Sequence, residues 1–298
     1  MPKDQVNIRP AAAADAEAVF RIHASVGGSI PWLDAEECRE HLEWIAGLGN
    51  PTIVAELDGE VVGSMDVWWG QDVPELGRSL DVSMIDVRAD RQRRGVGRAM
   101  IGHACKLAES NGCDCVSVRA DPAAGGFYEK MGFTPRLTLR DLSIAPDAVT
   151  MPAGFSLDPV KLSSLAIPPG GWFRVGRILH PRQRWRDMLA LEAEPPLWGD
   201  SGQRRPAVSA FLVAGPDSGE PAVAVYRLGH WANDASKAEL CLWSGRSDRP
   251  ELLACVAHAS TLGVRELSAF CYGGQADTLA EAGAARTGTE NVLYRPCW

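Results

Sequence analysis

Hydrophobic residues recur along this chain with two spacings, one of every second residue and one of every three or four. In the first half, segments with one spacing alternate with segments of the other, and glycine, proline or an Asp-Gly turn separates them. This pattern predicts short strands and helices in a mixed α/β domain. The predicted strands span residues 6–10, 52–57, 60–68, 80–87, 113–118 and 137–142, and the predicted helices span 13–26, 34–45, 96–111 and 123–131.

The second half repeats this order of elements. Strands are predicted at 208–213, 222–228, 239–243, 267–271 and 289–294, and helices at 250–261 and 275–282. Gly112 and Gly132, which end helices in the first half, have counterparts in Gly263 and Gly283 at the same separation. This equal spacing indicates a duplicated fold.

A stretch without either spacing separates the halves. Residues 147–156, DAVTMPAGFS, contain proline and glycine and are typical of a linker. We therefore expect a first domain over residues 1–146 and a second domain over residues 157–298.

Composition excludes several classes of protein. The chain has 298 residues and a formal net charge of −8, so general nucleic-acid binding, which depends on phosphate neutralisation, is not expected. No apolar stretch approaches the ~18 residues of a membrane span, and residues 1–10 lack the apolar core of an export signal. We expect a cytoplasmic protein with reduced thiols. Cys113 and Cys115 form a close pair, but alternation puts both on one strand face, which favours a structural role over a metal site.

The segment RADRQRRGVGRAM, Arg88–Met100, follows a predicted strand and opens a predicted helix. Gly95 and Gly97 permit positive φ and a close approach of the backbone. The N–H groups at the helix start, together with the helix dipole, form a site for an anion. The segment lacks the third glycine of a dinucleotide fingerprint and the Gly-Lys-Ser/Thr of a P-loop. A nucleic-acid patch and a solvated charge run are the alternative interpretations of its arginines.

Together with a second segment, this loop resembles the GCN5-related N-acetyltransferase (GNAT) family. The family's Q/R-x-x-G-x-G/A loop corresponds to residues 92–97, and its F-Y-x-x-x-G-F segment corresponds to residues 127–133. The resemblance covers residues 6–142, and the second half resembles a degenerate copy without the glycine loop. It implies an α/β fold in the broad α+β sense, with a mixed, mostly antiparallel sheet flanked by helices in each of two tandem domains.

The resemblance also implies acetyl-CoA as cosubstrate, no metal, and one cofactor site per chain. The loop would bind the pyrophosphate, and the strand before it would hold the pantetheine arm and the acetyl carbonyl. Asp121 replaces the family's usual asparagine, and an ionised carboxylate accepts but does not donate hydrogen bonds. Arg88 or Arg91 could pair with the ribose 3′-phosphate or be solvated. The predicted cofactor-binding residues are Ile85, Asp86, Val87, Gln92, Arg93, Arg94, Gly95, Val96, Gly97, Arg98, Asp121 and Tyr128.

Two catalytic residues follow from the same resemblance. Tyr128 matches the tyrosine that donates a proton to the leaving thiolate in the family. Asp81 lies eleven residues before Gln92, where histone-acetylating members carry a glutamate base. Asp86 and Asp66 compete for the role of base, and a solvated carboxylate at a strand end is the alternative interpretation of Asp81.

Aromatic residues are candidates for the acceptor side. Trp32 lies between the first two predicted helices and Trp68 at a strand end, where they could form a wall for an apolar or cationic acceptor. A core or domain-interface tryptophan is the alternative for each. His180 and His230 in the second half are interpreted as structural.

We therefore expect an N-acetyltransferase that transfers an acetyl group directly to the primary amine of a small molecule or peptide. The second half would buttress the acceptor cleft or form a homodimer surface, and no nucleic-acid or membrane partner is expected. An acyl-CoA-binding sensor without turnover, a nucleic-acid module, and a second half that recognises a partner remain the alternatives.

Overall fold

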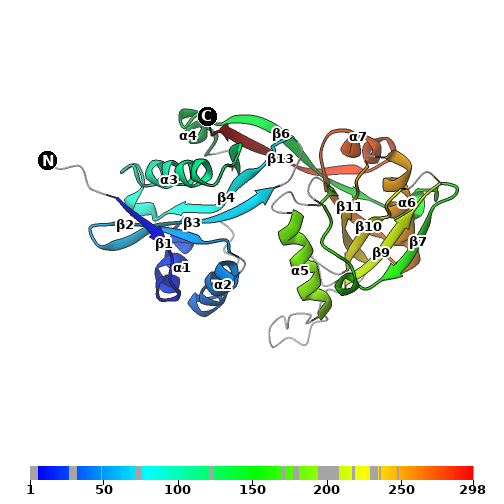
Figure 1. Ribbon diagram of the computed structural model, residues 1–298, viewed down its shortest axis with the longest axis horizontal. Coiled ribbons are helices and arrows are strands. Elements are labelled where there is room, and N and C mark those ends of the chain that lie inside the picture. The colour runs from blue at the N-terminus through cyan, green and yellow to red at the C-terminus, as the bar shows by residue number, and fades with distance from the viewer. Residues whose placement is uncertain are drawn as a thin grey trace. The chain divides into compact units, whose positions relative to one another are not determined.

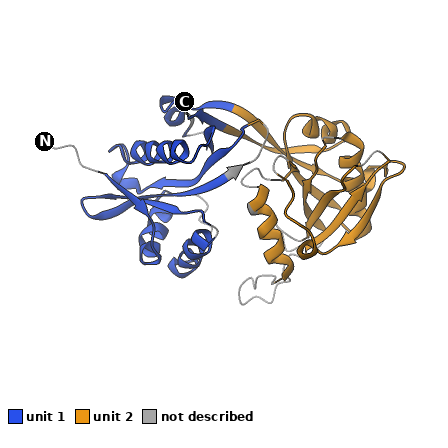
Figure 2. Cartoon of the chain, viewed as in Figure 1, with its two compact units in different colours: residues 1–71, 76–135, 293–298 blue, residues 72–75, 136–292 orange. Residues whose placement is uncertain are grey.

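The computed structural model describes residues 6–26, 32–47, 49–71, 75–120, 124–169, 172–176, 181–193, 208–216, 219–228, 234, 236–246 and 248–297. The chain forms two compact units (Figure 2). Unit 1 comprises Met1–Gln71, Leu76–Pro135 and Leu293–Trp298, and unit 2 comprises Asp72–Glu75 and Arg136–Val292. The chain thus leaves unit 1 within a strand, ahead of the linker predicted at residues 147–156, and returns to it at the C-terminal end. The reason is that both crossing strands are continuous through the boundary, which no local sequence pattern reveals.

Unit 1 is a sheet with helices on both faces (Figure 1). The strand order is β1-β2-β3-β4-β5, with β13 next to β5. Helix α3 packs on one face through Val96, Met100 and Ile101, whereas α1 and α2 cover the other face (Figure 1). The elements are β1 (Asn7–Pro10), α1 (Ala16–Ser25), α2 (Ala35–Gly47), β2 (Thr52–Leu57), β3 (Glu60–Gln71), β4 (Ser79–Val87), α3 (Val96–Ser110), β5 (Cys115–Arg119), α4 (Gly125–Lys130), β6 (Thr134–Ile144) and β13 (Ala285–Pro296).

Strand β4 bends away from β5 halfway along its length. The parallel register with β5 runs from Ser79 to Val82. Beyond this point, Met84 and Ile85 of β4 lie opposite Met65 of β3, because Asp66 pairs with Ser83 and Ser64 pairs with Asp86. This extra residue is a β-bulge, and Met84 has a φ of 47° there. The bulge bends β4 and opens a gap between the two parallel strands.

Unit 2 repeats the mixed sheet with the order β13-β6-β12-β11-β10-β9-β7. Its core contains apolar side chains from β10, β11, β12 and the helices α6 and α7. The sequence correctly predicted the elements from β9 to β13, but it missed β7, β8 and α5. The elements are β7 (Ser156–Val160), β8 (Phe173–Val175), α5 (Pro181–Ala193), β9 (Val208–Ala214), β10 (Ala222–Leu228), β11 (Lys237–Trp243), α6 (Arg249–Ala259), β12 (Glu266–Cys271) and α7 (Gly273–Glu281).

A short strand fills the corresponding gap in unit 2. Strands β11 and β12 are parallel from Lys237 to Leu240 of β11, and β8 then pairs with Leu242 and Trp243. The backbone N–H of Gly176, directly after β8, donates to the carbonyl of Phe270 in β12 at 2.7 Å. On the other side, the N–H of Ser244 donates to the carbonyl of Trp172 at 2.6 Å. The chain therefore occupies the opening between its own parallel strands.

No helix in the described part of the chain is long and apolar enough to cross a membrane.

The close packing of β8 against the residue that follows it gives a stability prediction. Gly176 has a φ of 128°, and a Cβ there would lie 2.3 Å from the ring of Phe173, which is buried against Trp243. Gly176→Ala is expected to lower the free energy of unfolding by about 1–3 kcal/mol, as measured by thermal unfolding. Gly274→Ala in α7 is the control, because a Cβ there meets nothing within 4 Å. Equal melting temperatures for the two variants would contradict this packing of β8 between β11 and β12.

Candidate active site

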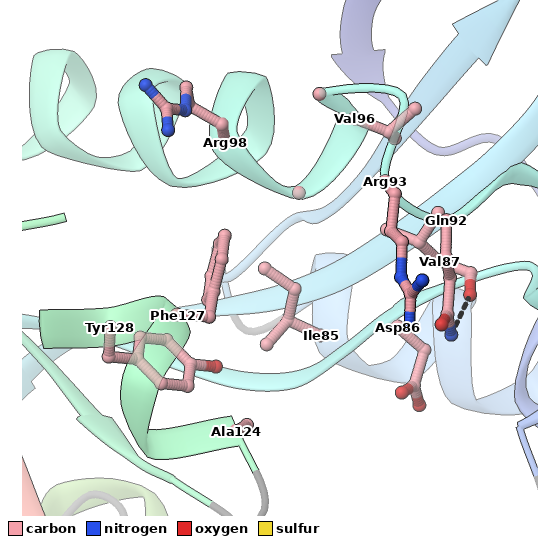
Figure 3. A pocket seen from close by; sticks show the side chains of 12 residues that line it. Ile85, Asp86, Val87, Gln92, Arg93, Val96, Arg98, Ala124, Phe127 and Tyr128 are labelled. Carbon is pink, nitrogen blue, oxygen red and sulfur yellow. Dashed lines mark hydrogen bonds between the residues drawn. The ribbon is translucent and has the colours of Figure 1, made fainter. Parts of the chain in front are cut away.

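A cavity of about 620 Å³ opens in unit 1 where β4 has parted from β5. The end of β4, the loop after it, the start of α3 and helix α4 surround it (Figure 3). Ten of the predicted cofactor-binding residues line this cavity, namely Ile85, Asp86, Val87, Gln92, Arg93, Gly95, Val96, Gly97, Arg98 and Tyr128. Arg94 is exposed and outside the lining, and Asp121 lies outside the described residues. Ala124 and Phe127 line the cavity too, and the Phe-Tyr motif was the signal that could have identified Phe127.

The loop before α3 has the backbone conformation that its glycines permit. Arg93 has a φ of 62° and Gly95 a φ of 88°, so two residues in the left-handed region lie just before the helix. The first bond within α3 runs from the N–H of Ala99 to the carbonyl of Gly95 at 3.0 Å, and no described side chain caps the helix. The N–H groups of the first turn are consequently available for an anion at the positive end of the helix dipole.

The arginines of the loop divide into two groups. Arg88 contacts Asp90 at 2.7 Å and Glu60 at 3.0 Å, and Arg91 contacts Glu60 at 3.3 Å. Neither Arg88 nor Arg91 lines the cavity, and both form ion pairs at the surface of the loop. Arg93 and Arg98 are the two cationic side chains of the lining, and Figure 3 shows them on the loop and on α3.

Tyr128 lies at the far end of the cavity from the loop (Figure 3). Its ring contacts Phe127 and Phe133 edge to face, with centroids 5.1 and 5.6 Å apart, and 4% of the residue is exposed. Burial raises the pKa of the phenol to about 12, and the negative charges of Asp86 and Asp81 add to this shift. The hydroxyl therefore keeps its proton at neutral pH and is a hydrogen-bond donor toward the cavity.

Asp81, the predicted base, does not line the cavity. It is 1% exposed, and the hydroxyl of Ser117 donates to its Oδ1 at 2.7 Å. Asp66 is also buried, where Thr52 donates to it at 2.6 Å and His41 Nε2 lies at 2.9 Å. Of the three predicted carboxylates, Asp86 is the one in the cavity lining. Its Oδ2 lies 2.6 Å from Nδ1 of His23 in α1, a contact that the sequence did not suggest.

The three carboxylates share one face of the sheet. The register pairs Ser64 with Asp86, Asp66 with Ser83, and Trp68 with Asp81, and paired side chains of neighbouring strands project to the same side. His23 of α1 and His41 of α2 contact this face through Asp86 and Asp66. A polar sheet face under helices is costly unless its groups are hydrogen-bonded, and these pairs meet that requirement.

The two predicted acceptor-binding tryptophans belong to this polar face and are outside the cavity lining. Trp32 and Trp68 are each 8% exposed. The Trp32 ring lies 5.2 Å from His23 and 5.1 Å from His41, and Trp68 Nε1 donates to Ser83 at 2.9 Å. Trp32 thus packs between the two histidines and Trp68 is held by Ser83, while contact of either ring with an acceptor stays a prediction.

The fold agrees with comparisons to known proteins. Residues 49–135 match the sequence profile of the acetyltransferase (GNAT) domain, so the first half of the chain contains a GNAT domain. No curated protein matches the sequence.

Solved structures of low sequence identity share the fold of the whole chain. A GCN5-related N-acetyltransferase from Anabaena variabilis ATCC 29413 is 14% identical, with 99% of this chain and 73% of that chain covered and a TM-score of 0.67. Eis1 from Mycobacterium abscessus is 20% identical, with 98% and 74% covered and a TM-score of 0.60. A tandem GNAT protein from the clavulanic acid biosynthesis pathway is 16% identical, with 99% of each chain covered and a TM-score of 0.56. The predicted fold class, a mixed and mostly antiparallel sheet flanked by helices in a tandem GNAT arrangement, is confirmed.

The Tyr128 phenol gives a pH prediction. Its pKa in the folded protein, about 12, exceeds the ordinary value of 10, so its contribution to stability is complete below pH 10 and is lost as the pH rises through 12. The difference in phenolate absorbance between the wild-type protein and Tyr128→Phe is therefore expected to titrate with a midpoint near 12. A midpoint near 10 would show that the phenol is solvated.

Proposed function

We propose that this chain, whose residues 49–135 match a GNAT acetyltransferase domain, binds acetyl-CoA in the cavity of unit 1 and acetylates a primary amine of a small molecule or peptide. The observation that carries the proposal is the meeting of three features at one cavity. These are the glycine loop at the start of α3, the end of β4 beyond its pairing with β5, and the buried phenol of Tyr128.

The donors around the cavity suit acetyl-CoA. The N–H groups of the first turn of α3, with Arg93 and Arg98, would hold the pyrophosphate. The segment Ile85–Val87, which β5 no longer pairs, would hydrogen-bond the amides of the pantetheine arm. The bound cosubstrate supplies an acetyl thioester.

The reaction needs a donor near the sulfur atom. As the acceptor nitrogen adds to the thioester carbonyl and the C–S bond breaks, negative charge develops on the sulfur. With a pKa of about 12, the Tyr128 phenol is a weaker acid than a thiol, whose reference pKa is ~8.5. Its contribution is therefore a hydrogen bond donated to the developing thiolate, which the phenol stabilises while keeping its own proton.

One cofactor site per chain is part of the proposal. In unit 2, helix α6 has Pro250 in its first turn, and the segment before it lacks the Gly-x-Gly of the loop before α3. Strand β8 occupies the opening between β11 and β12. The second half, in this proposal, is a degenerate domain that binds no cofactor and carries the surface of a homodimer or shapes the acceptor cleft.

An acyl-CoA sensor without turnover is the second candidate. It is favoured by the position of Asp81, since the predicted base lies outside the cavity lining. Turnover separates the two candidates, because both bind CoA.

Thiol release from acetyl-CoA, measured across a panel of amines and corrected for hydrolysis, is expected to identify an acceptor. Tyr128→Phe is expected to lower kcat on that acceptor on the order of 100-fold, because the leaving sulfur loses its donor. Tyr294→Phe in β13 is the matched control, since that tyrosine does not line the cavity, and it is expected to retain activity. Wild-type turnover by Tyr128→Phe would remove the phenol from the mechanism.

The loop is tested by binding. Gly95→Glu is expected to weaken CoA binding on the order of 100-fold, measured by calorimetry, because it puts a negative charge beside the pyrophosphate and strains a backbone with a φ of 88°. Gly59→Glu is the control, since Gly59 also has positive φ and open space but lies in the β2–β3 turn. Gly95→Ala separates strain from charge and is expected to lose less affinity. If Gly95→Glu binds CoA as tightly as the wild-type protein does, the loop before α3 does not bind the pyrophosphate.

A further inference from the structure

A chain of hydrogen bonds runs from the cavity into the layer between the sheet and α1. Asp86 is the one carboxylate among the described residues of the lining, and its Oδ2 lies 2.6 Å from His23 Nδ1. The other ring nitrogen of His23, Nε2, lies 3.1 Å from the hydroxyl of Ser64. His23 and Ser64 are buried, whereas one third of the Asp86 side chain is exposed. The carboxylate of Asp86 is therefore the member of this series of hydrogen bonds that faces the cavity.

The β-bulge in β4 determines where Asp86 points. Side chains alternate between the two faces of a regular strand, so Asp86 would share the face of Val82, which packs in the α3 core. The extra residue at Met84 inverts the alternation, and Asp86 pairs with Ser64 on the face covered by α1. Figure 3 shows the side chains of Ile85 and Asp86 on opposite sides of β4.

The hydrogen bonds define what each group does. A carboxylate accepts, so Nδ1–H of His23 donates to Asp86, and Nε2 accepts from the hydroxyl of Ser64. His23 thereby holds Oδ2 and leaves the second oxygen of Asp86 for a group in the cavity. The ring contact between His23 and Trp32, at 5.2 Å, fixes the imidazole from the other side.

Other titratable and charged groups lie on the elements around this pair. Tyr128 of α4 and Arg93 of the loop share the cavity with Asp86. Asp81 lies on the same strand face, and the His41–Asp66 pair of α2 and β3 lies further along it. After burial, the negative charge of Asp86 raises the pKa of Tyr128 more than that of Asp81 does, in keeping with the shared position of Asp86 and Tyr128 in the cavity lining.

We propose that Asp86 accepts the proton of the acceptor amine and that His23, anchored by Ser64, is its positioning residue. The inference rests on the proposed function. An alkylammonium has a pKa near ~10.4, as lysine does, so at neutral pH it must lose a proton before its nitrogen can attack. That proton passes to the free oxygen of Asp86 and from there to solvent. The nitrogen then forms the C–N bond and the C–S bond breaks. The nitrogen loses its second proton in this step, and this proton converts the leaving thiolate into the thiol of CoA.

The experiment compares two acceptors that differ in basicity. One is the alkylamine found by thiol release, and the other is its analogue with a trifluoromethyl group beside the amine, which is largely unprotonated at pH 7. Asp86→Asn is expected to lower kcat on the alkylamine on the order of 100-fold at pH 7 and to affect the analogue much less. The defect on the alkylamine is expected to shrink as the pH rises toward 10. The Kd for acetyl-CoA is expected to change little, which shows that the variant is folded.

His23 is tested by loss and rescue. His23→Leu removes the donor to Asp86 and is expected to reproduce part of the same amine-dependent defect. His23→Asn offers an amide N–H near the position of Nδ1 and is expected to restore the pH profile toward that of the wild-type protein. Asp66→Asn, in the second histidine–aspartate pair of the same face, is the matched control, and any loss there is expected to be equal for both amines.

The outcomes separate the inference from the proposed function. If the wild-type protein acetylates amines but Asp86→Asn loses activity equally on both acceptors, or keeps the wild-type pH profile, the inference is wrong and the function stands. An amine-dependent defect in Asp66→Asn instead of Asp86→Asn assigns the base to the other pair and also overturns it. If the wild-type protein acetylates no amine in the panel, the proposed function fails and the inference fails with it.

Discussion

The parting of two parallel strands is the constraint on which this structure depends. Backbone N–H and C=O groups that are removed from water need partners, and a strand that leaves its neighbour exposes a row of them. In unit 1, β4 leaves β5 after Val82, and the opening becomes the cavity. In unit 2, β11 leaves β12 after Leu240, and β8 supplies the partners from the chain itself. The same opening therefore leads to a candidate site in one unit and to a closed core in the other.

The two units also share a buried carboxylate in equivalent register. Asp81 of β4 pairs with Ser117 of β5, and Glu239 of β11 pairs with Ser268 of β12. In unit 1 the carboxylate accepts from the serine hydroxyl, whereas in unit 2 it forms an ion pair with Arg184 of α5. A buried carboxylate requires such partners in either case. The carboxylate at this position is thus buried and has a polar or charged partner in both units.

In the mechanism that we propose, the base is Asp86, the residue that the bulge redirects. A single extra residue at Met84 bends β4, widens the gap toward β5 and turns Asp86 toward α1, where His23 meets it. The cavity for the cosubstrate and the orientation of the carboxylate beside it consequently have the same structural cause. Tyr128 completes the arrangement, because its burial and, to a smaller extent, the neighbouring aspartates raise the pKa of the phenol and keep it protonated.

Features that depend on local chemistry were predictable from the amino-acid sequence. Hydrophobic spacing predicted most helices and strands, the repeated glycines indicated the duplication, and the loop at Gly95 and the motif at Tyr128 both lie at the cavity. Strand β8 was missed because three residues carry too little pattern, and its existence depends on a gap between distant strands. The contact between His23 and Asp86, 63 residues apart, was invisible for the same reason. Which carboxylate reaches the cavity depends on the tertiary structure, because one bulged residue inverts the alternation that predicts the direction of a side chain along a strand.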